Sequence, residues 1–562
     1  MQNQTSPTAQ TSHNHKVVAQ LKPTKLWNFF ATLSNIPRVS RQEKGVCDWL
    51  TQFAMERNLD YKIDAIGNFF IYKARQNSDS DKTVLLQQHM DMVCEKDLET
   101  NFDFETDSIV LRKDGDYIYA SNTTLGSDNG IGLVATLCIL DDLETPHPKI
   151  EAVFTMNEES GMDGIMNLDK SLISADYVLN LDTEEEGSVY ISSAGSRDLE
   201  TVIKPLVKLK TQKALQIKIT GMRGGHSGVN IGENRLNSNK VLGIILGQIQ
   251  SEILLCDING GSKRNAIPRN SQAIIVPKIL ENNRKNETNP ANLPNKIKSE
   301  IGEIEKTESQ IGGQIGTQSS KILITNLQKR LEIITKQITH NYQNIEPNIK
   351  IEILETVANS HFDSKTSDQI IHILASIHSG VWQMSHIVSN LVQTSNNLGV
   401  IQSENGKIKI INMVRSSDDF ELKLTVNQIL SIIQSNFGVN FEPFGKARTE
   451  LKFESCENTE LNEDKPDLQV FLSETTSGWK AEKNNILLDK FQQVHTQITG
   501  QNAEIKAIHA GLECGFLKDY LPNSNVISFG PQIEDAHSPK EHVKISSVEE
   551  FYRILQLLLV SL

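Results

Sequence analysis

Two residues, His89 and Asp91, have side-chain types and a spacing that suit metal chemistry. Residues 84–86 are apolar and no Gly or Pro interrupts 83–88, so we expect a strand that delivers His89. Side chains alternate between the two faces of a strand, so His89 and Asp91 should point the same way. A carboxylate that holds a neutral imidazole in place is a common way to prepare a metal ligand. Ordinary hydrogen bonds in a loop would explain the pair equally well.

A further acidic residue, Asp128, lies in the glycine-rich stretch Leu125–Gly132, just before the apolar segment Leu133–Leu140. The apolar segment predicts a helix, and its N-terminus favours an anion through the helix dipole. Asp128 could simply cap that helix. The glycines on both sides indicate instead that the backbone here approaches another group closely.

Acidic residues also follow two other expected strands. Glu158 and Glu159 follow the strand expected over 150–156, and Asp182 follows the one expected over 177–181. A solvated acidic turn would account for the glutamates, but one of them could bind a cation while the other acts as a base. Ligands of open α/β sheets bind at the carboxyl ends of the strands. We therefore expect these groups to meet there.

The candidate ligands are all oxygen or nitrogen donors: His89, Asp128, Glu159, Asp182 and His537. Such a set favours zinc, with manganese or cobalt as alternatives, over copper or an iron–sulfur centre. Three carboxylates and a bridging hydroxide would balance two divalent ions, so we predict a two-metal centre bridged by Asp128. Glu158 would remain free of metal and take the proton from a water whose pKa the metals lower to about 7.

The elements that must position these residues indicate more than one domain, because the chain has 562 residues, 38% of them hydrophobic. Strands and helices alternate over 23–196 and again over 476–562, and we expect these two parts to form one catalytic domain. Residues 197–475 should form a second domain. The polar residues 1–22 are expected to be a disordered tail.

Local patterns predict several elements before His89. A short helix is expected over 24–33, and a hairpin is expected from strands near 60–63 and 68–72. Ser40 and Glu43 have the spacing of a capping box, which predicts the start of the next helix. In the second domain, the composition shifts over 278–345 to Asn, Gln, Lys, Ile and Glu. We interpret this stretch as a polar surface insertion with one helix over 321–338.

Composition excludes some partners. The net charge is −14 and the pI about 5.6, which argues against nucleic acid or an anionic membrane as the main partner. We see no signal peptide and no run apolar enough to span a membrane. Six scattered cysteines without a C-x-x-C pair fit reduced thiols, so we expect a cytoplasmic protein.

The second domain contains three further candidate residues. His226 lies in the glycine-rich stretch Gly221–Gly228, which lacks the Lys-Ser/Thr ending of a phosphate-binding P-loop. Asn265 lies within Lys263–Arg269. Arg415 follows apolar strand residues and could bind a carboxylate, or it could be a solvated charge at a strand end.

Eight motifs, in order along the chain, resemble the M20 metallopeptidases: HMDMV, LGSDNGIG, NEESGM, LDTEEEG, GMRGGHSGV, KRNAIPR, HAGLECG and AHSP. Within that family the chain resembles the aminoacyl-histidine dipeptidase branch (peptidase D, Xaa-His dipeptidase). The resemblance covers nearly the whole chain apart from the first twenty or so residues and 278–345. It implies a two-domain α/β fold, in which a zinc-peptidase-like catalytic domain contains an inserted α+β lid and dimerisation domain.

The resemblance also implies roles for the residues that match the motifs. His89 and Asp182 would bind one zinc ion, Glu159 and His537 the other, and Asp128 would bridge them. Asp91 would orient the His89 ring, and Glu158 would be the general base.

The lid residues His226, Asn265 and Arg415 match positions that the family uses around the substrate carboxylate and the tetrahedral oxyanion. The family is commonly a homodimer in which lid residues complete the partner's site. Two residues depart from the pattern. Gln88 stands where a small residue is usual and should be tolerated because it faces away from His89, and Asn157 stands where Asp is common.

From these residues we predict a dipeptidase that hydrolyses dipeptides, including Xaa-His dipeptides, by attack of a metal-bridging water. Two alternatives stay open. The same metal site would serve an amidohydrolase that removes acyl groups from amino acids. A metal-binding protein without catalysis would be expected to lack Glu158 or one of the ligands, and this chain keeps them all.

Overall fold

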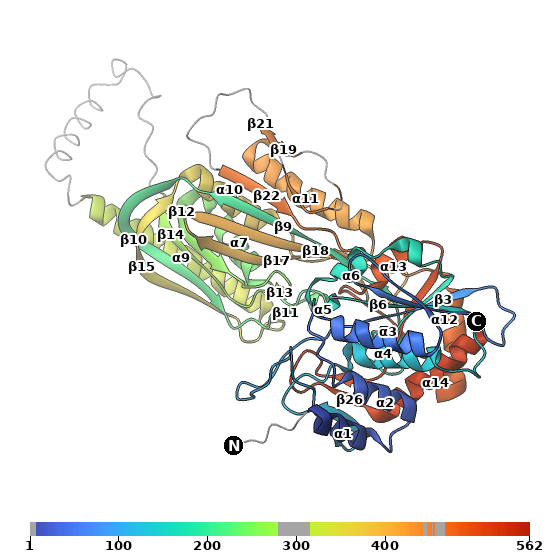
Figure 1. The fold of residues 1–562 in the computed structure, drawn as a ribbon. Coiled ribbons are helices and arrows are strands. Elements are labelled where there is room, and N and C mark those ends of the chain that lie inside the picture. The colour runs from blue at the N-terminus through green and yellow to red at the C-terminus, as the bar shows by residue number, and fades with distance from the viewer. Residues whose placement is uncertain (1–6, 279–314, 442–444, 446, 452, 456–466) are drawn as a thin grey trace, which may run out of the picture. The chain divides into compact units, whose positions relative to one another are not determined.

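A computed structural model of the chain describes residues 7–278, 315–441, 445, 447–451, 453–455 and 467–562. The chain divides into two compact units. Unit 1 comprises Met1–Gly195, Ser385–Leu391 and Thr476–Leu562, and unit 2 comprises Ser196–Met384 and Val392–Thr475. In Figure 1, unit 1 accordingly contains both the blue N-terminal and the red C-terminal elements, while the middle of the chain builds unit 2.

The main sheet of unit 1 has eight strands among the described residues. In spatial order these are β1 (Asp60–Ile63), β2 (Phe69–Lys73), β6 (Lys149–Thr155), β3 (Thr83–His89), β7 (Tyr177–Asn180), β24 (Asn525–Ser528), β8 (Ser188–Ser193) and β23 (Glu504–Ile508). The four central strands β6, β3, β7 and β24 run parallel. Because parallel neighbours end at the same edge of a sheet, the residues that follow β3, β6 and β7 come together there.

Helices surround this sheet. They are α1 (Pro7–Val18), α2 (Thr24–Leu33), α3 (Lys44–Glu56), α4 (Ser127–Leu140), α5 (Glu158–Gly161), α6 (Asp163–Met166), α12 (Ile486–Thr499), α13 (Cys514–Tyr520) and α14 (Ile545–Ser561), with the 3-10 turn η1 (Lys170–Leu172). A smaller sheet of unit 1 contains β25 (Ile533–Glu534), β26 (His542–Lys544), β5 (Tyr117–Ala120) and β4 (Leu111–Asp114).

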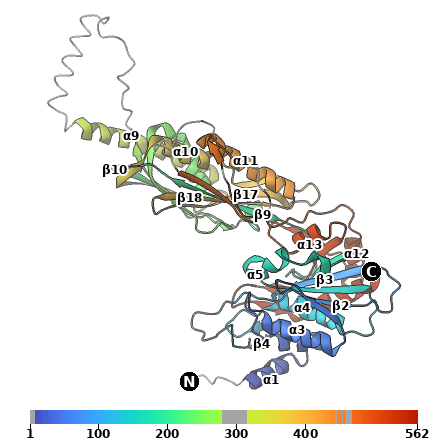
Figure 2. The ribbon, with the colours of Figure 1, turned by 45° about the horizontal axis from the view of Figure 1, so that its top comes forward.

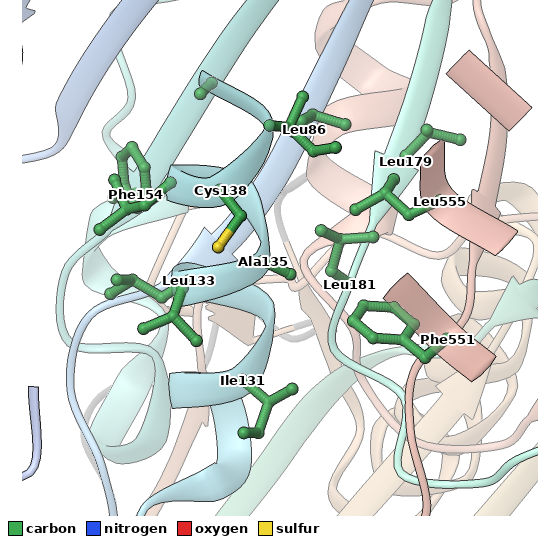
Figure 3. Close-up of a cluster of buried hydrophobic side chains, with 14 of the residues drawn as sticks. Leu86, Ile131, Leu133, Ala135, Cys138, Phe154, Leu179, Leu181, Phe551 and Leu555 are labelled. Carbon is green, nitrogen blue, oxygen red and sulfur yellow. The ribbon is translucent and has the colours of Figure 1, made fainter. Parts of the chain in front are cut away.

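Helix α4 is apolar on all sides and is buried in the core of unit 1. Figure 3 shows Cys138 of α4 packed near Leu86 of β3 and Leu179 of β7, with residues of α14 beside them. Gln88 lies on the same face of β3 as Leu86 and accepts a hydrogen bond from Thr136 of α4 at 2.8 Å. Helix α4 therefore covers the face of β3 opposite to His89, as we expected for Gln88.

The expectation of a disordered tail over 1–22 is wrong for the described part of that segment. Residues Pro7–Val18 form α1, and both Asn14 and Val18 are fully buried. Asn14 donates to the carbonyl of Ile109 at 2.8 Å and accepts from the amide of Leu111 at 2.9 Å. Hydrogen bonds between the Asn14 side chain and a backbone segment distant in sequence hold this helix in place. The helix lacks the apolar periodicity by which a sequence pattern would have predicted it.

The main sheet of unit 2 is antiparallel and contains ten strands among the described residues. In spatial order they are β15 (Lys350–Phe362), β10 (Val207–Thr220), β14 (Ser271–Pro277), β12 (Ile253–Gly260), β17 (Val392–Glu404), β18 (Lys407–Ser416), β9 (Gly195–Lys204), β22 (Asp467–Leu472) and β20 (Thr449–Glu450), with β16 (Gly380–Met384) paired to β17. Two short ribbons pair β11 (Gly225–His226) with β13 (Ala266–Ile267), and β19 (Val439–Phe441) with β21 (Phe453–Ser455).

The helices of unit 2 pack on this sheet, and Figure 2 shows α9, α10 and α11 along it. The helices are α7 (Ser238–Gln248), α9 (Ile315–Tyr342), α10 (Ser364–Ser376) and α11 (Asp419–Phe437), with the 3-10 turns η2 (Ile231–Glu233) and η3 (Gln250–Glu252). Helix α9 contains the helix expected over 321–338 and extends beyond it. Its residues Leu327 and Leu331 join the unit 2 core, so this part of the expected insertion is a core element and no surface decoration. Residues 279–314 of the insertion lie outside the described residues.

Candidate metal centre

His89 and Asp91 lie at the end of β3, where the side chains of both are buried. The His89 ring places Nδ1 3.1 Å from the main-chain oxygen of Asp91 and 3.4 Å from its Oδ1. A proton on Nδ1 would point at Asp91, so Nε2 is the ring atom that could bind a metal ion. Nε2 faces Asp128 Oδ1 at 3.1 Å and Asp182 Oδ1 at 3.3 Å.

Asp128 lies between two imidazoles. One carboxylate oxygen is 3.1 Å from His89 Nε2, and the other is 3.1 Å from His537 Nε2. The backbone of Asp128 is not helical, with φ −81° and ψ 113°, and the peptide bond to Asn129 is cis. A carboxylate that presents its two oxygens to two different donors has the arrangement of a bridging ligand.

Glu158 and Glu159 lie in α5, a single helical turn, and not at the end of a strand as we expected. The strand β6 stops at Thr155, and Asn157 then turns the chain with a φ of +50°. The amides of Glu158 and Glu159 donate to the two oxygens of Asp91 at 3.0 and 3.1 Å. Asp91 therefore holds both the His89 ring and the start of the turn that carries the two glutamates.

The side chain of Glu159 contacts the second imidazole. Its Oε2 lies 3.2 Å from His537 Nε2, while its buried Oε1 has no hydrogen-bond partner within the described part of the chain. His537 itself comes from the loop between β25 and β26, and its side chain is 53% exposed. An orphaned carboxylate oxygen beside a histidine is a costly arrangement unless something else binds there.

Asp182 and Glu184 follow β7. Asp182 accepts a hydrogen bond from the side-chain amide of Asn129, which also donates to the carbonyl of Leu181 at 2.8 Å. Glu184, which we did not predict as a site residue, places a carboxylate oxygen within 4.8 Å of the donor atoms of Asp128 and His537. Its position two residues after Asp182 repeats the spacing of His89 and Asp91, and that spacing was a usable signal.

The electrostatics of this region reflect an excess of buried carboxyl groups. Burial raises the pKa of Asp182 to about 6, against the attraction of His89, and burial together with the charge of Asp128 raises the pKa of Glu184 to about 9. Burial also raises the pKa of Glu158 well above its usual value. The acidic groups thus repel one another in the absence of added positive charge.

The two histidines respond in the opposite direction. Burial alone would lower the pKa of His89, but the charge of Asp182 and hydrogen bonds with its acidic neighbours raise it well above the usual value. Hydrogen bonds with Asp128 and Glu159 raise the pKa of His537 to about 11. The surrounding carboxylates therefore favour the protonated, positively charged form of both imidazoles when no metal ion is bound.

Two buried residues that sequence reasoning missed support the ligand loops. Arg38 donates to the carbonyls of Met90 and Asp91 at 3.2 and 2.9 Å, and to that of Gly126. The carboxylate of Glu541 accepts from the amides of Leu125, Gly126 and Ser127, at 2.8, 3.0 and 2.7 Å. Arg38 thus holds the chain near His89, and Glu541 holds the loop that carries Asp128.

The expected capping box at Ser40 and Glu43 is wrong. Helix α3 starts at Lys44, and no side chain caps it. The Ser40 hydroxyl donates to Asp91 Oδ2 at 2.7 Å, and Glu43 Oε1 accepts from the amide of Asn157 at 2.8 Å. Both residues therefore support the candidate metal centre, because long-range partners compete for the groups that the local pattern assigns to a cap.

Two candidate residues of unit 2 lie at one short ribbon, His226 within it and Asn265 directly before its second strand. His226 on β11 is paired with Ala266 of β13, next to Asn265. His226 Nδ1 accepts from the amides of Gly228 and Val229, both at 3.2 Å, so the ring presents an N–H at Nε2. Burial, and then the charge of Arg415, lowers the pKa of His226, so the ring is neutral.

The third candidate, Arg415, is the next-to-last residue of β18 and is 6% exposed. Its guanidinium contacts the sulfur of Met413 at 3.6 Å, and its Nε has no hydrogen-bond partner in the described residues. Burial lowers the pKa of Arg415 to about 10, although the charge of Asp198 opposes that shift. Asp198 is itself paired with Arg264, so Arg415 retains unused donor capacity.

The donor atoms of unit 1 form three overlapping groups that could each hold a metal ion: His89 with Glu158 and Glu159, His89 with Asp128 and Asp182, and Asp128 with Glu184 and His537. The donor atoms in each group lie within 4.8 Å of one another. All are carboxylate oxygens or imidazole nitrogens, and the buried Oε1 of Glu159 lacks a partner. The residues therefore fit divalent cations of the zinc or manganese type. Within the described residues, no helix combines the length and the apolar character needed to span a lipid bilayer.

Sequence comparison identifies the class of protein that this site belongs to. The profile of Peptidase family M20/M25/M40 matches residues 85–561, which include every candidate ligand. The chain therefore belongs to this peptidase family, and the family and the mixed α/β fold expected from the motifs are confirmed.

Individual relatives narrow the comparison. The chain is 29% identical over 550 residues to the cytosol non-specific dipeptidase of Escherichia coli (strain K12), covering 96% of this chain and 98% of that protein. It is similar to the crystal structure of aminoacylhistidine dipeptidase from Vibrio alginolyticus, with a TM-score of 0.78, 29% identity, and coverage of 98% of this chain and 99% of the other. Aminopeptidase PepT from Bacillus cereus shares the fold, with a TM-score of 0.51 and 12% identity over 96% of this chain and 100% of that one.

Proposed function

We propose that the protein is a dinuclear metallodipeptidase. The observation that carries this proposal is the position of Asp128, whose two oxygens each lie 3.1 Å from a different histidine. Asp182 accompanies His89, and Glu159 accompanies His537. The two halves of the site are thus built alike around one shared carboxylate.

In this proposal each cation has its own pair of ligands. His89 and Asp182 hold one cation, Glu159 and His537 hold the other, and Asp128 bridges them. The cations, zinc being the first choice, would polarise the scissile carbonyl and lower the pKa of the attacking water. The crowding of buried carboxyl groups and the raised pKa of Asp182 support this assignment, because bound cations would relieve both.

Glu158 is the proposed general base and acid. Its carboxyl group lies within 4.8 Å of the donor atoms of His89 and Glu159, and among the described residues it has no hydrogen-bond partner. Burial raises its pKa, so it can keep a proton taken from water and return it to the leaving amine. Asp91 positions this residue by accepting its backbone N–H.

We further propose that the substrates are dipeptides and include Xaa-His dipeptides. Two relatives with nearly full-length similarity support this: one is named a non-specific dipeptidase and the other an aminoacylhistidine dipeptidase. The name of the first relative also supports a cytoplasmic location. His226, Asn265 and Arg415 are proposed to bind the substrate carboxylate and the oxyanion, because a buried guanidinium with an unused donor suits a carboxylate.

The test is a panel of dipeptides, Xaa-His dipeptides and N-acetyl amino acids, assayed with metal-stripped protein and after addition of zinc, manganese or cobalt. We expect stripping to abolish dipeptide hydrolysis and one of the metals to restore it. Turnover of N-acetyl amino acids but not of dipeptides would favour the amidohydrolase alternative. Full activity in protein shown to be free of metal would exclude the proposed centre.

A homodimer with a shared site is part of the proposal. Glu158→Ala and His226→Ala proteins should each be inactive, and mixing them should restore part of the activity through heterodimers. Subunit exchange must be checked separately, for example with two affinity tags. Exchange without any recovery would exclude a site shared between chains.

A further inference from the structure

A row of buried polar side chains crosses the main sheet of unit 1 beneath the candidate ligands. Gln87, Asn180 and Ser528 occupy paired positions on β3, β7 and β24, and all three are fully buried. Strands in the middle of a parallel sheet are usually apolar throughout, because both faces are covered. A row of polar residues there needs a reason.

The row forms one directed chain of hydrogen bonds. The Ser528 hydroxyl donates to Asn180 Oδ1, and Asn180 Nδ2 donates to Gln87 Oε1 at 2.5 Å. Gln87 Nε2 then donates to Glu513 Oε2, and the hydroxyl of Thr155 on β6 donates to the same oxygen at 2.7 Å. One oxygen of Glu513 is thus the final acceptor of a chain that spans four strands, and bonds in such chains strengthen one another.

The row lies one step below the ligand layer. Gln87 precedes His89 by two residues, and Asn180 precedes Asp182 by two. Each polar side chain therefore points to the same face of the sheet as the candidate ligand two residues after it. The backbone confirms the common level, because the amide of Leu181 donates to the carbonyl of Gln87 at 3.0 Å. Any slip between β3 and β7 would move His89 and Asp182 apart and would break the bond between Gln87 and Asn180.

Glu513 has no other role in the proposed mechanism, although it is fully buried at the start of α13. Its second oxygen, Oε1, has no partner in the described residues. Burial raises the pKa of Glu513 to about 8, which favours the neutral acid, and its Oε2 accepts hydrogen bonds. A neutral acceptor fixes the amides without adding to the negative charge of the ligand layer.

We propose that Glu513 is a positioning residue that, through Gln87, Thr155 and Asn180, holds His89 and Asp182 at the separation that a shared metal ion needs. The proposal rests on the proposed function, because it takes these two residues as ligands. Partners behind the ligands of a metal commonly affect affinity, typically by about 10- to 100-fold.

The chain offers a matched pair of variants. Gln87 and Gln88 are neighbours on β3, both fully buried and both hydrogen-bonded, but they face opposite sides of the sheet. Gln88 donates to the carbonyl of Val153 at 2.8 Å and accepts from Thr136. Gln87→Met and Gln88→Met remove similar hydrogen bonds, yet only the first breaks the row.

The readout is zinc affinity, measured by competition between metal-stripped protein and a coloured chelator, together with the thermal midpoint of the stripped protein. We expect both variants to lower the midpoint by a similar amount. Gln87→Met should weaken zinc binding by about 10-fold or more, and Gln88→Met should leave it near the wild-type value. At saturating zinc, Gln87→Met should lower kcat for a dipeptide more than it changes KM.

Glu513 is tested in the same assay. Glu513→Gln keeps an oxygen that accepts from Gln87 and Thr155, so its zinc affinity should stay within about 3-fold of wild type, whereas Glu513→Leu should weaken it by about 10-fold or more. If Glu513→Leu does not fold, the Gln87 variants and Glu513→Gln still decide the question.

Two outcomes would overturn the positioning role: equal zinc affinity for Gln87→Met and Gln88→Met, or a loss of affinity in Glu513→Gln as large as in Gln87→Met. The second would mean that the charge of Glu513 matters, and not its hydrogen bonds. These results are distinct from failure of the proposed function, in which wild-type protein itself would neither bind zinc nor hydrolyse dipeptides.

Discussion

The two units hold buried charge in opposite ways. In unit 1, carboxyl groups outnumber the two imidazoles, and burial and mutual repulsion raise the pKa values of Asp182 and Glu184. In unit 2, a buried guanidinium, Arg415, has an unused donor and a lowered pKa. Arg38 is equally buried but donates to three carbonyls. The charge of Arg38 thus has hydrogen-bond partners within the protein. The guanidinium of Arg415 and the crowded carboxyl groups of unit 1 lack enough partners among the described residues, and we propose that ligands supply them.

The largest expected effect lies in unit 1 and separates the two glutamates of α5. Glu158→Gln should keep both metals but lower kcat by at least about 10²- to 10⁴-fold, because the proposed mechanism gives Glu158 the roles of both base and acid. Glu159→Gln should instead weaken metal binding, and excess metal should restore part of the activity. Elemental analysis of both purified variants, with activity at two metal concentrations, decides between the roles.

The control for this pair is Glu185→Gln. Glu185 lies close in sequence to the centre but is paired with Lys506, and it is neither a ligand nor a base in the proposal. It should keep metal content and turnover. If Glu158→Gln lost metal while Glu159→Gln kept it with no turnover, the two roles would have to be exchanged.

The next effect lies in unit 2. Arg415→Met should raise KM for dipeptides by about 10- to 100-fold, as expected for loss of a hydrogen bond to a charged group, and should leave metal content unchanged. Arg330, an exposed arginine of the same unit paired with Glu252, provides the matched control Arg330→Met. Steady-state kinetics with one dipeptide give both constants. An unchanged KM in Arg415→Met would remove the carboxylate-binding role.

A smaller effect concerns the pH dependence of the metal-free protein. Asp182 and Glu184 have folded-state pKa values of about 6 and 9, above their ordinary values of 3.8 and 4.5. Between the ordinary and the raised pKa of each group, the folded state holds a proton that the unfolded state has lost. The free energy of unfolding therefore falls as the pH rises through that range. The raised pKa of His537 acts in the same direction above its ordinary value of 6.5, since its stabilisation is lost as the pH approaches 11.

Urea unfolding of metal-stripped protein at pH 6 and pH 9 measures this fall. Zinc-loaded protein is the control, because bound cations replace the protons and the decrease should disappear. Equal stability of the stripped protein at both pH values would mean that the carboxyl groups are not crowded as described.

The smallest effect on activity is expected from shortening the stretch 278–345, which we interpreted as a polar insertion. Deletion of 281–314 should leave kcat nearly unchanged, because this segment contains none of the motif residues. Leu331→Ala, in contrast, should lower stability by about 2–5 kcal/mol, because Leu331 is fully buried in the core of unit 2. Turnover and thermal unfolding of the two variants test this difference. A large loss of turnover in a folded deletion protein would give 281–314 a functional role.

Much of unit 1 could be predicted from sequence because local patterns mark its strands. The apolar run before His89 became β3, and the segment after Asp128 became α4. Glu184 was also within reach, since the alternation that links His89 to Asp91 also links Asp182 to Glu184. The one-turn helix at Glu158 was missed because its geometry depends on Asn157, whose positive φ no apolar pattern reports.

The supports of the site could not be predicted, because their partners are remote in sequence. Glu541 accepts from Gly126 across 415 residues, and Arg38 reaches Gly126 across 88. Ser40 and Glu43 fit a local cap so well that the sequence favoured the wrong partners. A buried charged side chain with several backbone partners carries no pattern of its own until the fold brings those partners together.

The separation of Asp128 and His537, 409 residues apart along the chain, has a consequence for biosynthesis. The strands β23 and β24 and the His537 loop are made only after the ribosome has completed all of unit 2. At ordinary rates of synthesis the delay is about 20–80 s. During that time Asp128, Glu159 and Asp182 exist without His537, on a sheet that lacks β23 and β24, two of its eight described strands. Because unit 1 includes residues 476–562, it can be completed only after all of unit 2 has been synthesised.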